Sequence, residues 1–180
     1  ESDVLSAIKK YYGIGAETIE KIIDQSKEQD GAGQPAALID EAQEMADDAS
    51  IIKFVNQILL QAVGDRATDI HMEPFEGELR VRFRIDGILY DTVIPPTIKY
   101  FHQAIVSRIK IMANMNIAER RLPQDGRFKV KLQERELDLR VSVIPTSFGE
   151  SVQIRVLSSI FFLNLEKLGF IEDDLKKIEY

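Results

Sequence analysis

The sequence predicts an α+β domain built on a largely antiparallel sheet, and three observations support this prediction. Apolar and polar residues alternate through six short segments, which is the period of strands with one buried face. Apolar residues recur at helical spacing in two longer segments, 50–62 and 97–113. The order helix, three strands, helix, three strands, with short turns between neighbouring strands, favours hairpins over the long crossovers of a parallel sheet.

The first helix and first strand are read from residues 50–73. Ser50 is expected to cap a helix that reaches about Ala62 and ends at Gly64, because serine accepts hydrogen bonds from the first free backbone amides. Residues 69–73 then alternate with their apolar members facing the core, which predicts a strand.

A hairpin follows, with one strand over 79–85 and its partner over 88–93. Asp86 and Gly87 supply the two-residue turn that such hairpins prefer. This register places Phe83 opposite Tyr90 on the inward face and predicts an ion pair between Arg82 and Asp91.

The second helix is introduced by two prolines and runs to about Ala113. A loop over 116–126 leads to a strand over 127–132, and a turn at Gln133 and Glu134 opens the last hairpin.

The last hairpin holds the main candidate site, a pair of arginines. Leu139, Val141 and Val143 alternate with polar residues on one strand, and the partner strand over 151–156 alternates in the same way. Pairing the apolar faces places Arg140 directly opposite Arg155. Because like charges in this position repel, a shared anion is one explanation for the pair. Two solvated arginines, each beside an acid, are the other explanation.

Composition narrows the class of protein. The chain has 180 residues, no cysteine and a net charge of −7, yet all 11 arginines lie between Arg66 and Arg155. An acidic chain argues against bulk nucleic-acid binding, so any anion is expected to meet the middle of the chain. The sequence shows neither a signal peptide nor an apolar run of membrane-spanning length, which predicts a cytoplasmic protein.

Four motifs occur in an order and spacing that resemble the type II secretion and type IV pilus assembly ATPase family. The resemblance covers residues 49 to about 170 and points to the second N-terminal domain of these proteins. The motifs are the strings Ala-Thr-Asp-Ile-His-Met-Glu-Pro at 67–74, Arg-Phe-Arg-Ile-Asp-Gly at 82–87, Arg-Arg-Leu-Pro-Gln-Asp-Gly-Arg at 120–127 and Leu-Arg-Val-Ser-Val-Ile-Pro-Thr at 139–146.

The resemblance implies a domain plan. Residues 1–28 are expected to be the C-terminal helices of a first N-terminal domain, and 29–48 a flexible acidic linker. Residues 49–158 are then a PAS-like second domain, and 159–180 a hinge with the start of an ATPase domain.

The resemblance also implies a function. The parent protein is expected to be a hexameric motor ATPase that uses ATP and magnesium, with Arg140 and Arg155 reaching the nucleotide phosphates. Expected partners are its own ATPase domain, neighbouring subunits of a ring, and an inner-membrane platform or a cytoplasmic adaptor protein. Attachment at the inner membrane would then run through those partners. Which of the two machines the motor serves stays open.

This sequence contains no Gly-x-x-x-x-Gly-Lys-Ser/Thr loop that would hold a triphosphate with magnesium. We therefore expect neither ATP hydrolysis by this chain alone nor a bound cofactor. Asp69, His71 and Glu73 share one strand face, a spacing that a divalent metal accepts. No metal site is predicted, because a structural role for Asp69 and His71 is the stronger interpretation.

Three further arginines, Arg120, Arg121 and Arg127, flank the loop of turn residues. By analogy with the family they are expected to serve subunit packing or a structural role, and a solvated loop is the alternative.

Two rival functions remain. A PAS-like module that binds a protein or a small effector, without contacting nucleotide, predicts an apolar pocket. A nucleic-acid platform is disfavoured, because base stacking needs aromatic residues and cations on one face.

Overall fold

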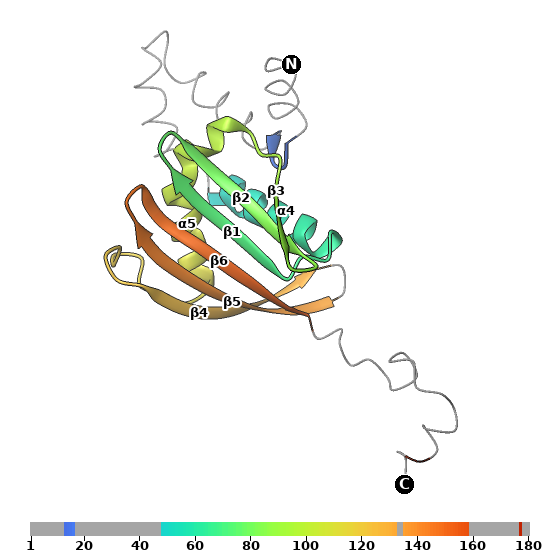
Figure 1. Cartoon of the computed structure of the whole chain (residues 1–180). Coiled ribbons are helices and arrows are strands. Elements are labelled where there is room, and N and C mark those ends of the chain that lie inside the picture. Colours follow the sequence, from blue (N-terminus) through green and yellow to red (C-terminus); the bar gives the residue numbers. More distant parts are fainter. Residues whose placement is uncertain (1–12, 17–47, 133–134, 159–176, 178–180) are drawn as a thin grey trace, which may run out of the picture.

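The computed structural model describes residues 13–16, 48–132, 135–158 and 177. Six antiparallel strands form one sheet in the order β3-β2-β1-β6-β5-β4, and two α-helices and one 3₁₀ helix accompany it (Figure 1). The predicted α+β class is confirmed. The elements are α4 (Asp48–Gly64), β1 (Asp69–Phe75), β2 (Glu78–Ile85), β3 (Ile88–Asp91), η1 (Pro96–Phe101), α5 (His102–Met112), β4 (Gln124–Leu132), β5 (Arg135–Thr146) and β6 (Gly149–Ser158).

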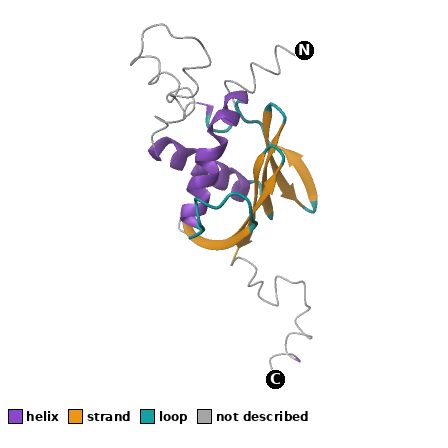
Figure 2. Cartoon of the chain, turned by 90° about the vertical axis from the view of Figure 1, so that its left-hand side faces the viewer, coloured by secondary structure: helices purple, strands orange, loops and turns teal. Residues whose placement is uncertain are grey.

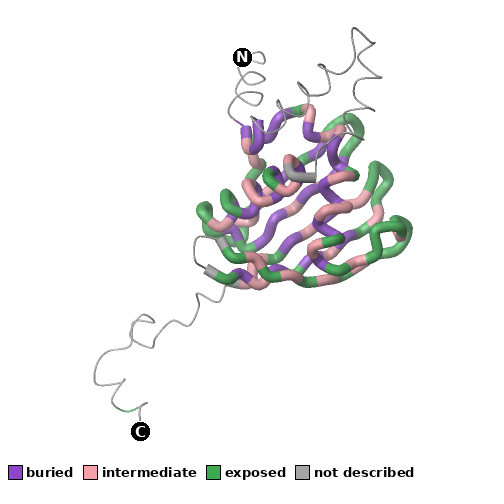
Figure 3. Tube along the Cα trace, turned by 180° about the vertical axis from the view of Figure 1, so that it is seen from behind, coloured by how far each residue is buried: buried purple, intermediate pink, exposed green. Residues whose placement is uncertain are grey.

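The helices lie on one face of the sheet, and no other described residues cover the opposite face (Figure 2). Burial alternates along the strands, as expected for a sheet with one packed face (Figure 3). The predicted core face of α4 is confirmed, since each residue predicted to face the core is at most 2% exposed; these residues are Ile51, Phe54, Val55, Ile58, Leu59 and Ala62.

Ser50 is not the cap of α4, so that prediction is wrong. The helix already includes Asp48 and Ala49, and it ends at Gly64 as expected. A local pattern therefore located this helix better than it located its first residue.

The first hairpin has the predicted register, with Phe83 opposite Tyr90 and Arg82 opposite Asp91. Two details are wrong. Tyr90 is 51% exposed because β3 is a short edge strand, whereas Phe83 is buried. The guanidinium of Arg82 binds Glu73 on the neighbouring strand β1 instead of Asp91.

The second helical segment divides into η1 and α5, and β4 starts at Gln124, three residues earlier than predicted. Pro95 and Pro96 lack backbone N–H groups, which suits an irregular, tight first turn. The turn at Gln133 and Glu134 lies outside the described residues.

Of the expected domains, the structure describes mainly the second one, residues 49–158 without 133–134. Residues 13–16 pack on this domain, because the backbone amide of Ile14 donates to the carbonyl of Val93 at 2.9 Å. Gly15 has φ +77° and leaves no room for a Cβ beside the ring of Phe54. The rest of 1–28, the linker before Asp48, and the hinge region other than Lys177 lie outside the described residues.

Candidate anion-binding face

The bare face of the sheet carries a transverse row of charged residues. Strand register places Arg140 opposite Arg155, as predicted, and extends the same row over five strands. Paired positions in antiparallel strands project to the same face. We call this set the arginine row; from β2 to β4 it consists of Arg84, Asp69, Arg155, Arg140 and Arg127.

Asp69 is the most enclosed member of the row, with a side chain that is 6% exposed. Its Oδ1 accepts a hydrogen bond from Nε of Arg155 at 2.9 Å, and Nε of Arg84 lies 3.6 Å from Oδ2. The hydroxyl of Thr68 donates to Oδ2 at 2.9 Å, and the side-chain amide of Gln153 donates to Oδ1 at 3.3 Å. This carboxylate therefore joins β2, β1 and β6.

The charge of Asp69 is fixed by these contacts. Burial alone would raise the pKa of the carboxyl, but the hydrogen bonds from Arg155, Thr68 and Gln153, together with the positive charge of Arg155, lower the pKa below its ordinary value. Asp69 is therefore ionised at neutral pH.

Arg140 and Arg127 differ from Arg155 in having no carboxylate partner among the described residues. Within the part of the chain that the structure describes, neither side chain forms a hydrogen bond or an ion pair, and both residues are exposed. Arg140, Arg155, Gln153, Ser142 and Asp125 line an open depression of about 340 Å³ on this face. The row thus presents two arginines without an ion pair among the described residues, next to a hollow whose lining also includes the carboxylate of Asp125.

Asp69, His71 and Glu73, which lie on one face of β1, do not form a metal site among the described residues. Glu73 binds Arg82, whose Nε donates at 2.9 Å, and Asp69 binds Arg155. Among the described residues no group of three histidine or carboxylate side chains could hold a metal ion. Burial is the main cause that lowers the pKa of His71, and the imidazole packs between these ion pairs as a neutral group.

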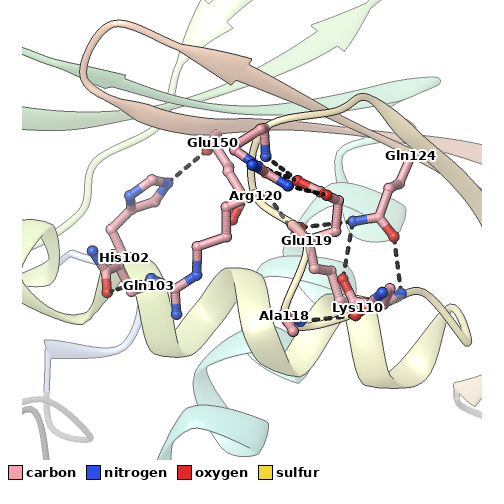
Figure 4. Close-up of polar contacts among 10 residues, drawn as sticks. His102, Gln103, Lys110, Ala118, Glu119, Arg120, Gln124 and Glu150 are labelled. Carbon is pink, nitrogen blue, oxygen red and sulfur yellow. Dashed lines mark hydrogen bonds and ion pairs between the residues drawn. The ribbon is translucent and has the colours of Figure 1, made fainter.

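Arg120 and Arg121 lie outside the strands of the row, in the loop between α5 and β4. Figure 4 shows Arg120 in this loop. Arg120 donates to the side chain of Gln103 on α5 at 3.3 Å, while Arg121 pairs with Glu119 at 3.3 Å and its side chain is 88% exposed. Arg127, which the sequence predicts to begin the strand after this loop, lies on β4 in the arginine row. The three arginines therefore do not form one cluster.

The loop is held by a buried lysine that the sequence analysis did not single out. Lys110 on α5 is 1% exposed, donates to the carbonyl of Glu119 at 2.7 Å and lies 2.5 Å from the carboxylate of Glu150 (Figure 4). That carboxylate oxygen makes no well-aligned hydrogen bond, so the contact with Lys110 is an ion pair. The side-chain amide of Gln124 donates to the same Glu119 carbonyl at 3.0 Å.

A sequence signal for Lys110 does exist. It lies four residues after the buried Val106 and next to the buried Ile109, so helical spacing places it on the core side of α5. A lysine at such a position needs a buried partner, because an unpaired charge is costly to bury.

Comparison with known proteins gives this domain its family. The family model described as "Type II/IV secretion system protein" matches residues 44–180, which is more than half of the chain. The chain belongs to this family. The predicted resemblance is thereby confirmed.

Several curated members of the type II/IV secretion system family are close in sequence. The chain is 46% identical to the type IV pilus assembly ATPase PilB of Myxococcus xanthus, over 94% of this chain and 30% of that protein. It is 44% identical to the type II secretion system protein E of Xanthomonas campestris pv. campestris, over 97% and 30%. Identity to the type II secretion system protein HxcR of Pseudomonas aeruginosa is 51%, over 68% and 26%.

The chain thus spans about 30% of the length of the first two relatives. The family membership supports a role in secretion or pilus assembly. None of the helices in the described residues is both long enough and apolar enough to cross a membrane.

Proposed function

We propose that this chain is the regulatory, nucleotide-clamping part of a hexameric motor ATPase that powers assembly of a type IV pilus or a type II secretion pseudopilus. In this proposal Arg140 and Arg155 contact the phosphates of a nucleotide bound by an ATPase domain of the same protein. The names of the relatives, a type IV pilus assembly ATPase and type II secretion proteins, support this class of machine.

The observation that carries the proposal is the pairing of Arg140 with Arg155 on a bare sheet face. Two arginines in direct cross-strand register repel each other unless an anion lies between them or acids compensate both. Asp69 compensates Arg155, while Arg140 has no ion-pair partner among the described residues. An incoming phosphate would remove the remaining repulsion and receive charge-assisted hydrogen bonds.

The residues present fit a phosphate group and do not fit a complete ATP site. Guanidinium groups offer planar donors that match phosphate oxygens, but this sequence has no phosphate-binding loop. Magnesium and the triphosphate would therefore be held elsewhere in the parent protein. Arg140 and Arg155 would stabilise negative charge on the phosphates, as positive groups from outside the loop do in other NTPases.

The proposal also includes a way for ATP to control the position of this domain. Bound nucleotide would attract the arginine row, and loss of the terminal phosphate would weaken that attraction. The segment Ser158 to Asn164, which begins at the last residue of β6, would serve as the hinge. Further partners in this proposal are neighbouring subunits of the ring and an inner-membrane platform or its cytoplasmic adaptor, with the protein itself cytoplasmic.

The test uses the full-length protein that contains this chain and an ATPase domain. We expect Arg140→Ala and Arg155→Ala each to lower the ATPase rate at least about tenfold, since arginines at a transferring phosphoryl group contribute about 10³–10⁵. Arg80→Ala is the matched control, because Arg80 lies on the same sheet face outside the arginine row and pairs with Glu78. Wild-type rates in both row variants would show that the row does not contact nucleotide.

The alternative function is an effector-binding or protein-binding module that does not contact nucleotide. One feature favours it, a hollow of about 280 Å³ at the end of the sheet. Its apolar lining includes Pro74, Phe75, Tyr100 and Phe148. This alternative predicts that substitutions in the hollow change activity while substitutions in the arginine row do not.

A further inference from the structure

Arg155 is held differently from the other arginines of this face. Its Nε donates to Asp69 at 2.9 Å, and its two terminal amino groups make no hydrogen bond with any described residue. Arg82, in contrast, uses both Nε and a terminal nitrogen to bind Glu73. Arg84 donates from a terminal nitrogen to the carbonyl of Gly87 at 2.9 Å.

This difference matters for anion binding. A guanidinium binds phosphate best through a pair of parallel N–H donors. When the inner Nε is fixed by a carboxylate, the terminal nitrogens remain available and the side chain loses fewer conformations on binding. The side chain of Arg155 is 59% exposed even though the carboxylate that holds it is 6% exposed.

Asp69 is itself firmly placed. Thr68 and Gln153 each donate a hydrogen bond to its carboxylate, so both oxygens have partners besides the arginines. Because Asp69 is on β1 and Arg155 on β6, the contact also sits at the junction of the two halves of the sheet. The carboxylate is therefore a rigid support rather than a mobile counter-ion.

We propose that Asp69 is a positioning residue for the anion-binding face: it holds Arg155 by Nε and thereby leaves the terminal nitrogens of that guanidinium free for a phosphate group. This inference rests on the proposed function and deepens it. Asp69 does not contact the phosphate and acts only through Arg155.

The test is a double-substitution cycle in the full-length protein, with ATP affinity, KM and kcat as readouts. Asp69→Asn removes the charge that holds Arg155 while keeping the size of the side chain. We expect this variant to weaken ATP affinity about tenfold, the effect of losing one charge-assisted hydrogen bond. Adding Asp69→Asn to Arg155→Ala should cause no further loss, because Asp69 acts through the arginine.

Glu73→Gln is the matched control. It removes the carboxylate of the neighbouring Glu73–Arg82 ion pair, whose arginine lies outside the arginine row. We expect ATP affinity to stay within about twofold of wild type, since the loss of a partly exposed ion pair affects mainly stability. If Glu73→Gln weakens ATP binding as much as Asp69→Asn does, the effect is general and the positioning role is wrong.

A second variant keeps the inference testable if Asp69→Asn fails to fold. Arg155→Lys retains the positive charge. A lysine has a single ammonium group, however, so it cannot bind Asp69 through one nitrogen and present a planar pair of N–H donors to a phosphate with two others. We expect it to lose about as much ATP affinity as Arg155→Ala. Wild-type affinity in Arg155→Lys would overturn the inference, because charge alone would then suffice.

The outcomes separate this inference from the proposed function. If Arg140→Ala and Arg155→Ala have wild-type rates, the proposed function fails and the positioning role fails with it. If both are impaired but folded Asp69→Asn is normal, only the positioning role is overturned. Losses that multiply in Asp69→Asn/Arg155→Ala would also overturn it, because Asp69 would then act independently.

Discussion

Lys110 and Glu150 form an ion pair between α5 and β6, with the ammonium nitrogen 2.5 Å from the carboxylate. The lysine side chain is 1% exposed and the glutamate side chain 13% exposed. The same ammonium group donates to the carbonyl of Glu119 at 2.7 Å, so one buried charge fixes both the start of β6 and the loop before β4.

We expect Lys110→Ala to lower the free energy of unfolding by about 3–5 kcal/mol, because it leaves Glu150 and the Glu119 carbonyl without their partner. Urea unfolding of the 180-residue chain measures this change. Lys129→Ala is the control, since Lys129 pairs with Glu136 at 2.9 Å in an exposed position and should change stability by less than about 1 kcal/mol. Equal effects of the two substitutions would contradict the buried role of Lys110.

We expect His102 to make the stability of the domain depend on pH. Its ring donates from Nε2 to the carbonyl of Glu150 at 2.8 Å, and burial lowers the pKa of the imidazole although the contacts with Glu150 act in the opposite direction. A histidine with a lowered pKa contributes its full stability above its ordinary pKa of about 6.5 and loses it as the pH falls toward the lowered value. We expect stability to fall from pH 7.5 to 5, by at most about 1.4 kcal/mol per pH unit from this group.

Chemical unfolding at several pH values tests this dependence. The chain has two histidines, and burial lowers the pKa of His71 as well, so each must be replaced separately. His102→Gln should reduce the loss of stability between pH 7.5 and 5 relative to the wild-type protein. If only His71→Gln reduces it, the pH dependence does not come from His102.

Gly126 is required where β4 passes the end of α5. A Cβ at this position would lie 2.5 Å from the carbonyl oxygen of Ala113 and 2.9 Å from Cε of Met115. We expect Gly126→Ala to destabilise the domain by about 1–3 kcal/mol, because the backbone of Ala113 cannot yield as a flexible side chain would. Thermal unfolding, followed by circular dichroism, measures the effect.

Gly64→Ala is the matched control for that substitution. Gly64 ends α4, and a Cβ there would meet no atom within 4 Å. It should leave stability unchanged or raise it by up to about 1 kcal/mol, because alanine favours the helix more than glycine does. Destabilisation by both alanines to a similar extent would count against a steric cause at Gly126.

The sequence predicted the parts of the fold that depend on local pattern. Strand alternation fixes which residues face the core, and a shift by one residue would expose every apolar side chain. The pairing of Arg140 with Arg155 follows from that constraint and is confirmed. The same reasoning wrongly predicted an ion pair between Arg82 and Asp91. A long side chain on a central strand can reach acids on both neighbouring strands, and Arg82 binds Glu73 on β1.

The two halves of the domain meet at a place that the sequence analysis did not predict. Each three-stranded unit follows from its own turns, but β1 and β6 pair although Asp69 and Arg155 are 86 positions apart in the sequence. No turn or spacing connects these strands. The Lys110–Glu150 ion pair is a second contact that local sequence pattern could not predict, because it joins residues from α5 and β6.

By itself, the sequence determined the α+β class, the register of the last hairpin and the resemblance that the family comparison confirms. Only the tertiary structure decided that Asp69 holds Arg155 while Arg140 stays unpaired among the described residues. The physical reason is range. Alternation and turn chemistry act over a few residues, whereas the contact that orients Arg155 forms only when two distant strands become neighbours in one sheet.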